Sequence, residues 1–355
     1  MLYSAVRPLL FALDPETAHC ATLASLDALN RLGAAAFLAT AAPNIHVRAM
    51  GLDFPNPVGL AAGMDKDGAH IDGLSALGFG FIEVGAVTPR PQPGNERPRL
   101  FRLPEHRALI NRMGFNNEGM EACARRLAAL PPGARLGPLG VNVGKNKATP
   151  NDRAAEDYLA CIDRLHPFAD YLVVNISSPN TPGLRALQER DQLDRLLRTC
   201  AGRLAEVAPG KPLLVKLAPD LEPEALDEAV DVAIAAGAAG IIATNTTLSR
   251  EGVQGHPRAG EAGGLSGAPL EALATGVVRR IARRAAGRVP GVGCGGVLDA
   301  GGAYAKIRAG ASLVQVYTGL VYGGPGFVRE ICRGLDELLR RDGFDSVSKA
   351  VGVDR

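Results

Sequence analysis

The chain has 355 residues, enough for one large α/β domain with an extension or for two domains. Its 39 basic and 37 acidic residues nearly balance, which gives no electrostatic case for a nucleic-acid partner. No run of about 18 apolar residues occurs, which excludes a membrane-spanning helix. The six scattered cysteines form no CxxC pair, so we expect no metal site, no disulfide framework and a reducing cytosolic setting.

Residues 1–43 predict two helices ahead of the main domain. An apolar series at helical spacing predicts the first helix. Asp14 and Pro15 then supply an N-cap and a first-turn proline for a second helix, which ends near Gly33 or Pro43. Two interpretations stay open: a helical pair packed on the main domain, or a pair whose apolar face lies in a membrane interface.

After a short hairpin at 45–56, predicted strands alternate with predicted helices. We expect strands at 57–62, 80–86, 138–144, 169–176, 211–217, 239–244, 289–294 and 312–317. We expect helices at 68–77, 118–130, 153–165, 188–207, 223–236, 269–285 and 300–308. Eight strands in this alternation favour a closed (β/α)8 TIM barrel with an N-terminal two-helix extension. No GxGxxG follows the first strand, which argues against a dinucleotide-binding sheet.

The predicted chain therefore has three parts. Residues 1–43 form the helical extension, residues 44–340 form the barrel, and residues 341–355 form a polar tail to which we assign no role. The basic run RRIARR at 279–284 falls on a predicted helix, where it forms a solvated face or, as the alternative, a contact with anionic lipid.

The segments that follow the predicted strands are rich in Gly, Asn, Thr and Lys. They read AAGMDKDG (61–68), GAVTPRPQPGN (85–95), VNVGKNK (141–147), NISSPNT (175–181), VKLAPD (215–220), TNTT (244–247), GCGG (293–296) and YTG (317–319). Because the chemistry of a (β/α)8 barrel gathers at the C-terminal ends of its strands, these segments predict one site.

Lysines, asparagines and glycines suggest what this site binds. Lys216 lies within an apolar strand, where a cation is costly unless it meets an anion or accepting atoms. Gly295 and Gly296 suit a phosphate site, although close helix–strand packing is the alternative reading. An array of asparagines suits an imide- or amide-containing ring, although each one alone is typical of a cap or turn: Asn111, Asn142, Asn175, Asn180 and Asn245.

Taken together, the ordered motifs resemble dihydroorotate dehydrogenase over roughly residues 1–330. They are LAAGMDKDG, NRMGFNN (111–117), NVGKN, NISSPNTPGLR, ATNTT, GGLSG (263–267) and VQVYTG. The N-terminal helices and the serine in NISSPNT resemble the membrane-associated, quinone-using class, because the soluble classes have a shorter barrel with a cysteine base. The resemblance implies an FMN-bearing barrel that oxidises dihydroorotate to orotate in pyrimidine synthesis.

The resemblance also implies roles for single residues. Ser178 matches the general base that removes the C5 proton of the substrate. Substrate contacts are implied for Lys66, Asn111, Arg112, Met113, Gly114, Phe115, Asn175, Asn180, Asn245 and Thr246. Flavin contacts are implied for Ala62, Gly63, Met64, Asp65, Lys66, Ala86, Asn142, Asn175, Lys216, Thr244, Gly267, Gly296, Tyr317 and Thr318. A quinone channel is implied at His19, Arg102 and Tyr317.

The same resemblance predicts partners and a location. We expect a membrane quinone, with ubiquinone as the first choice, contact with the membrane surface through the N-terminal helices, a peripheral position on the cytoplasmic face, and a monomer. Two positions depart from the family pattern: Ala86 stands where a threonine is expected, and Cys294 where valine is usual. The first removes one hydroxyl contact to the flavin, whereas a buried cysteine behaves as a small apolar residue.

Two other functions stay open. One is a soluble flavin barrel that reduces a different pyrimidine or uses fumarate as its acceptor, which an acceptor screen distinguishes. The other is a non-catalytic barrel that only binds a phosphorylated ligand, which predicts a colourless protein rather than a yellow one.

Overall fold

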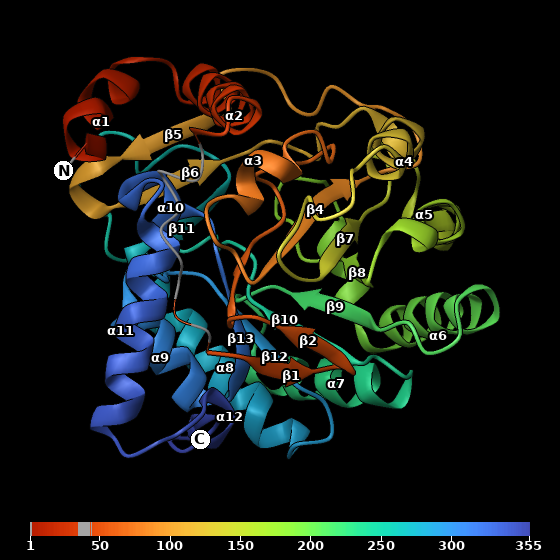
Figure 1. Ribbon diagram of the computed structural model, residues 1–355. Helices are drawn as coiled ribbons and strands as arrows, with labels where there is room; N and C mark the ends of the chain where they lie inside the picture. The colour runs from red at the N-terminus through yellow and green to blue at the C-terminus, as the bar shows by residue number, and fades with distance from the viewer. Residues whose placement is uncertain (1, 35–42, 44) are drawn as a thin grey trace.

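A closed barrel of eight parallel strands forms the centre of the computed structural model, which describes residues 2–34, 43 and 45–355 (Figure 1). The strands are β3 (Val58–Leu60), β4 (Phe81–Val87), β7 (Leu139–Val143), β8 (Tyr171–Asn175), β9 (Leu213–Leu217), β10 (Gly240–Ala243), β12 (Gly291–Cys294) and β13 (Ala311–Val316). Each pairs with the next in this series, and β13 pairs with β3 to close the barrel. The predicted fold class and all eight predicted strands are confirmed.

Bulky side chains fill the lower part of the barrel lumen. The Phe81 ring lies over Gly59 on the neighbouring strand, where a Cβ atom would come within 2.2 Å of it. The Tyr171 ring lies in the same way over Gly140, again 2.2 Å from the position of a Cβ. Each large ring therefore packs over a glycine that is its register partner on the adjacent strand. The lower barrel is thus a packed core, and its upper end is left for a site.

An outer ring of helices surrounds the barrel (Figure 1). It contains α3 (Ile71–Ser75), α4 (Gly119–Ala128), α5 (Ala154–Leu165), α6 (Arg190–Val207), α7 (Pro223–Ala235), α8 (Glu271–Ala285), α9 (Ala300–Ala309) and α11 (Phe327–Arg341), with the short α10 (Thr318–Gly323) and α12 (Val347–Ala350). The seven predicted helices are present, whereas α10, α11 and α12 were not predicted. The polar tail at 341–355, for which no role is predicted, packs through the buried Val347 and Ala350.

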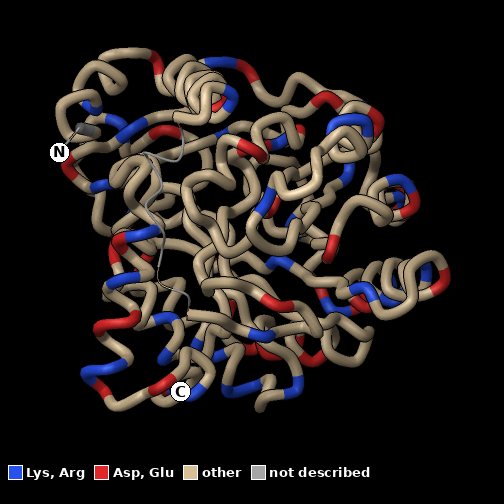
Figure 2. Tube along the Cα trace, viewed as in Figure 1, with Lys and Arg blue, Asp and Glu red and all other residues tan. Residues whose placement is uncertain are grey.

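Charged residues of both signs are interspersed along the outer helices (Figure 2). In the basic run at 279–284, Arg280 pairs with Asp227 of α7 at 2.8 Å, and Arg284 pairs with Asp231. Two of the arginines in this run therefore join α8 to α7 on the surface of the barrel.

The N-terminal part begins with α1 (Leu2–Ala12) and α2 (Pro15–Arg31). The Asp14 side chain accepts hydrogen bonds from the backbone N–H groups of Glu16 and Thr17, so the predicted N-cap is confirmed. The predicted boundary between residues 43 and 44 adjoins the segments 35–42 and 44, which lie outside the described residues. None of the helices that the structure describes combines the length and hydrophobicity needed to cross a bilayer.

Two small antiparallel sheets flank the barrel. The predicted hairpin is β1 (Val47–Ala49) with β2 (Leu52–Phe54), at the end of the molecule opposite α1 and α2 (Figure 1). A second sheet, which was not predicted, joins β5 (Leu100–Leu103), β6 (Ala108–Asn111) and β11 (Gly264–Gly267), with a small core of its own. Its strands are only four residues long, and β11 is distant from β6 in the sequence, so no local pattern indicates the pairing.

Candidate active site

A pocket lies at the C-terminal ends of the barrel strands and extends to the β5–β6–β11 sheet. It holds about 1040 Å³ of space that no atom fills, including solvent at its mouth. Nineteen of the residues predicted for the site line it: Ala62, Gly63, Lys66, Ala86, Asn111, Met113, Gly114, Phe115, Asn175, Ser178, Asn180, Lys216, Thr244, Asn245, Thr246, Gly267, Gly296, Tyr317 and Thr318. The strand-end segments therefore converge on one cavity, as the fold requires.

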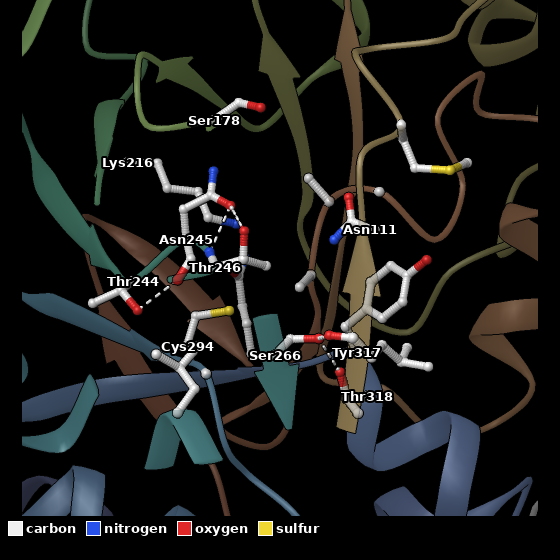
Figure 3. A pocket seen from close by; sticks show the side chains of 18 of the residues that line it. Asn111, Ser178, Lys216, Thr244, Asn245, Thr246, Ser266, Cys294, Tyr317 and Thr318 are labelled. Carbon is white, nitrogen blue, oxygen red and sulfur yellow. Dashed lines mark hydrogen bonds between the residues drawn. The ribbon is translucent and has the colours of Figure 1, made fainter. Parts of the chain in front are cut away.

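Ser178 and two asparagines form one wall of this pocket. Ser178 is buried in the loop after β8, and its hydroxyl oxygen accepts a hydrogen bond from the backbone N–H of Asn180 at 3.2 Å. The Asn180 amide nitrogen donates to the Asn111 carbonyl oxygen at 3.1 Å, which ties the loop to the end of β6. Figure 3 shows Ser178 and Asn111 facing the pocket from different segments of the chain. The loop is thus held by polar contacts from a sheet that the sequence did not reveal.

Two lysines bring positive charge into the pocket and form no ion pair with any residue that the structure describes. Lys216 is buried at the end of β9, and Lys66 is half-buried in the 61–68 loop. Burial lowers the pKa of Lys66. Neither ammonium group hydrogen-bonds another described residue. Because a desolvated cation is costly unless it meets accepting atoms, both groups fit a ligand that carries anionic or carbonyl oxygens.

The far end of the pocket is lined by glycines and hydroxyl groups. Gly296 has φ +74°, and a Cβ there would lie 2.3 Å from the Glu271 Cα, so only glycine fits. The Ser266 and Thr318 hydroxyl oxygens are 2.8 Å apart and both line the pocket (Figure 3). Glycine backbone N–H groups that no Cβ atom obstructs, together with hydroxyl donors, suit a phosphate group. The lysines and asparagines that line the rest of the pocket suit a flavin ring. The residues present therefore fit a phosphorylated flavin.

Six predicted residues do not line the pocket: Arg112, Met64, Asp65, Asn142, His19 and Arg102. Asp65 is buried behind the 61–68 loop, where its carboxylate accepts backbone N–H groups from Asp67, Ala69 and His70. It therefore shapes the loop that carries Gly63 and Lys66.

Met64 is buried in the main core and Arg112 lies outside the cavity. The Arg112 guanidinium pairs with Glu261 at 2.7 Å and lies 4.6 Å from the centre of the Phe101 ring. Asn142 is fully buried in β7 and accepts a hydrogen bond from the Asn175 amide nitrogen at 2.9 Å. Asn142 and Asn175 thus stand in barrel strands rather than in rim loops, and Asn142 supports Asn175 from behind.

The three residues predicted for a quinone channel come from three different elements. Tyr317 lines the pocket, and burial raises its pKa to about 12. Arg102 on β5 donates to the Phe11 carbonyl oxygen of α1 at 2.8 Å and lies 4.8 Å from the centre of the Phe11 ring. His19 on α2 is half-buried, and its pKa is lowered to about 4 by burial and by the charge of Lys66. These residues lie along the junction of the helical pair with the barrel.

Sequence reasoning missed several lining residues. Leu100 and Leu109 belong to the unpredicted sheet. Ser266 stands in the GGLSG motif, in which only Gly267 is predicted to contact the flavin. Gln315 lies in the apolar strand β13. A polar residue inside an apolar strand was the signal that identified Lys216, and the same signal applies to Gln315. Among the described residues, no group of three His, Cys, Asp or Glu side chains is placed to hold a metal ion.

Comparison with known proteins gives consistent matches along the whole chain. Residues 44–339 match the family model described as dihydroorotate dehydrogenase. "Dihydroorotate dehydrogenase (quinone)" of Anaeromyxobacter dehalogenans (strain 2CP-1) is 72% identical over 354 residues, covering 100% of this chain and 97% of that protein. The protein of the same name from Myxococcus xanthus is 55% identical, covering 99% and 98%. Among solved structures, the DHODH of Eimeria tenella in complex with ferulenol is 39% identical with a TM-score of 0.86, covering 96% of each chain.

Proposed function

The chain belongs to the dihydroorotate dehydrogenase family, and from this premise we propose how its residues divide the reaction. As a member of the quinone-dependent class, it oxidises dihydroorotate to orotate in pyrimidine synthesis and passes the electrons to a quinone. The resemblance noted in the sequence motifs is thereby confirmed, and the family uses a flavin. The assignments of residues, of the particular flavin and of the membrane contact are proposals.

FMN is the flavin that the pocket supports best. Gly296, Ser266 and Thr318 would hold its phosphate, because this end of the pocket offers hydroxyl groups and backbone free of Cβ atoms. Lys216 would compensate negative charge at the ring, since its ammonium group is buried and hydrogen-bonds no other described residue. Gly63 and Ala86 would let the ring approach the backbone. When bound, FMN supplies the acceptor for the hydride of the substrate.

Dihydroorotate would lie between Ser178, Lys66 and the asparagine side chains. Lys66 would pair with its carboxylate, and Asn111, Asn175 and Asn245 would bond its imide edge through donor and acceptor groups. Ser178 would take the C5 proton. A serine is a weak base, so burial of its hydroxyl and exclusion of water by the surrounding loop are part of this assignment.

The helical pair would bring the protein to the cytoplasmic face of the membrane and admit the quinone, with ubiquinone as the first candidate. Val6, Leu9 and Leu13 of this region expose 39%, 72% and 46% of their surface, which is unusual for large apolar residues in one small segment. His19, Arg102 and Tyr317 would line the path from these helices to the pocket. A monomer is the oligomeric state that we propose.

One experiment tests donor, flavin and acceptor in order. The absorbance spectrum of the purified protein is recorded before and after anaerobic addition of dihydroorotate, and then after addition of ubiquinone. We expect a flavin band that bleaches with the first addition and returns with the second. Mass spectrometry of the flavin released by denaturation distinguishes FMN from FAD. A flavin band that dihydroorotate leaves unchanged contradicts the proposed site.

A further inference from the structure

A carboxylate lies buried in the barrel lumen beneath the pocket and has no role in the reaction described above. Glu83 on β4 is fully buried. Its Oε1 accepts a hydrogen bond from the Asn142 amide nitrogen at 2.8 Å, and its Oε2 accepts one from the Gln315 amide nitrogen at 2.6 Å. The Tyr171 hydroxyl donates to Oε2 at 3.4 Å. Three neutral donors thus converge on one carboxylate. An ionised carboxylate has no hydrogen-bond donor, so each of these contacts must be donated by the neighbour.

This carboxylate determines which end of each neighbouring amide points toward it. Because the Asn142 amide nitrogen faces Glu83, its carbonyl oxygen faces Asn175 and accepts from that amide nitrogen at 2.9 Å. The Asn175 carbonyl oxygen then accepts from the Ser177 hydroxyl at 3.1 Å, and the Ser177 oxygen accepts from the Asn245 amide nitrogen at 3.0 Å. The network therefore has one direction from Glu83 to the substrate side of the pocket.

The branch through Gln315 ends on an unpaired atom. Gln315 lines the pocket and is 1% exposed, and it pairs in the barrel ladder with Cys294, whose side chain Figure 3 shows at the pocket wall. Its nitrogen is directed to Glu83, and its carbonyl oxygen accepts no hydrogen bond from any described residue. A buried acceptor without a donor is costly, so a ligand donor at this position would be stabilising.

We propose that Glu83 is a positioning residue for the flavin: by accepting from the Gln315 amide nitrogen, it makes Gln315 present its carbonyl oxygen to an N–H group of the bound ring. This inference rests on the flavin site proposed above. An oxidised isoalloxazine carries one ring N–H, in its imide portion, whereas its other polar edge atoms are acceptors. A reversed Gln315 would offer an NH2 group instead, so the direction set by Glu83 decides whether this contact is favourable.

Glu83→Gln in the full-length holoprotein tests the direction of the Gln315 amide. The new carbonyl oxygen still accepts from Asn142, but the new amide nitrogen faces Gln315 and forces its amide to reverse. We expect flavin affinity, measured from the fluorescence of flavin released on dilution, to fall about 10- to 100-fold. The KM for dihydroorotate should change less than twofold, because the Asn142 and Asn175 branch keeps its direction.

Gln315→Leu, alone and combined with Glu83→Gln, shows whether Glu83 acts on flavin binding through the Gln315 amide or through its own charge. Gln315→Leu removes the acceptor, so it should weaken flavin binding to a similar extent, and adding Glu83→Gln to it should weaken binding little further. Tyr171→Phe removes the longest of the three contacts and serves as the matched control, with unchanged flavin release. Additive losses in the double variant, or unchanged flavin release in Gln315→Leu, would overturn the inference. A wild-type protein that holds no flavin would instead contradict the function proposed above.

Discussion

The pocket at the barrel rim and the N-terminal helical pair are held in place by different means. Pocket residues stand at the ends of strands such as β8 and β9, in which every residue is buried. Directional hydrogen bonds join the polar side chains of these residues, as between Asn175 and Asn142. In contrast, α1 and α2 lie on the surface of the barrel and leave large apolar side chains exposed, with Leu9 at 72% and Leu32 at 80%. The barrel strands position the first region, whereas the second is held by one buried face of α2 and by a few polar contacts.

Polar anchors hold the helical pair on the barrel. Glu16 of α2 is buried and accepts two hydrogen bonds from the Arg99 guanidinium, at 2.6 and 3.1 Å. Tyr3 of α1 donates to the Val321 carbonyl oxygen at 2.6 Å, and Asp27 of α2 pairs with His70 at 2.6 Å. Leu23 and Leu26 of α2 are also buried in the main core, whereas Leu9 of α1 stays exposed. This combination suits an element that docks on a barrel and also meets an apolar phase. The comparison predicts that the two regions can be altered separately.

Deletion of residues 1–40 should separate them most completely. We expect the truncated protein to retain its flavin and to oxidise dihydroorotate with a soluble dye as acceptor, because the pocket belongs to the barrel. Ubiquinone reduction and binding to lipid vesicles should be lost. The measurement compares dye and quinone activities of the truncated and full-length proteins. Full quinone activity without the helices would show that the quinone reaches the flavin by another path.

Ser178→Ala should have the opposite effect. We expect dihydroorotate oxidation to fall by a factor on the order of 10²–10⁴ with either acceptor, because the general base is lost. Flavin colour and vesicle binding should remain. Ser75→Ala is the matched control, since Ser75 is a buried serine of α3 outside the pocket, where its hydroxyl oxygen accepts from the Leu136 backbone N–H. Near-normal turnover in Ser178→Ala would remove that residue from the role.

Glu16→Gln should loosen the helical pair while the barrel stays intact. Burial opposes ionisation, but the hydrogen bonds and charge of Arg99 hold the pKa of Glu16 below its ordinary value. Removing one partner of a buried pair costs about 3–5 kcal/mol, because the remaining charge stays uncompensated. We expect faster hydrogen exchange in α2 and a raised KM for quinone, with dye-coupled activity unchanged.

Arg97→Gln is the control for this anchor. Arg97 pairs with the same Glu16 carboxylate at 2.9 Å, but its side chain is 71% exposed, so its loss should cost about 1 kcal/mol or less. Equal effects of the two substitutions would mean that the burial of Arg99 contributes nothing to holding α2.

The same contrast explains what could be predicted from the sequence. The eight strands and the Asp14 cap follow from local patterns of apolar residues and turn chemistry, and those patterns were sufficient. The pairing of β6 with β11 joins segments far apart in the chain, so Leu109 and Ser266 were not expected in the pocket. Glu83 and Asn142 could not be understood alone, because their roles depend on which amide end faces which oxygen.

Leu9→Gln should weaken membrane contact without affecting the barrel. Burial of a leucine side chain is worth about 1.5–3 kcal/mol, so partition onto vesicles should fall about tenfold if Leu9 enters the lipid. Leu273→Gln is the matched control, because Leu273 is an exposed leucine (40%) on the barrel helix α8. Sedimentation with vesicles measures both. An equal loss in the two variants would mean that general surface hydrophobicity, rather than α1, drives the binding.

Mild acid should weaken the docking of α2 slightly, through His19. Burial and the charge of Lys66 lower the pKa of His19 from 6.5 to about 4. When α2 leaves the barrel, the pKa returns to its ordinary value, so the released state binds the proton more tightly. Docking is therefore strongest above pH 6.5 and weakens as the pH falls from 6.5 toward 4. At pH 6 a single such proton changes the docking equilibrium by at most about fourfold.

Limited trypsin digestion measures this effect, because Arg31 is exposed at the end of α2. Cleavage after Arg31 should be faster at pH 6 than at pH 7.5, after correction for the activity of trypsin on a peptide substrate. In His19→Gln the difference should disappear, since no titrating ring remains there. Glu16 does not account for a change in this window, because its lowered pKa keeps it ionised. An unchanged pH dependence in His19→Gln would show that His19 is not the group responsible.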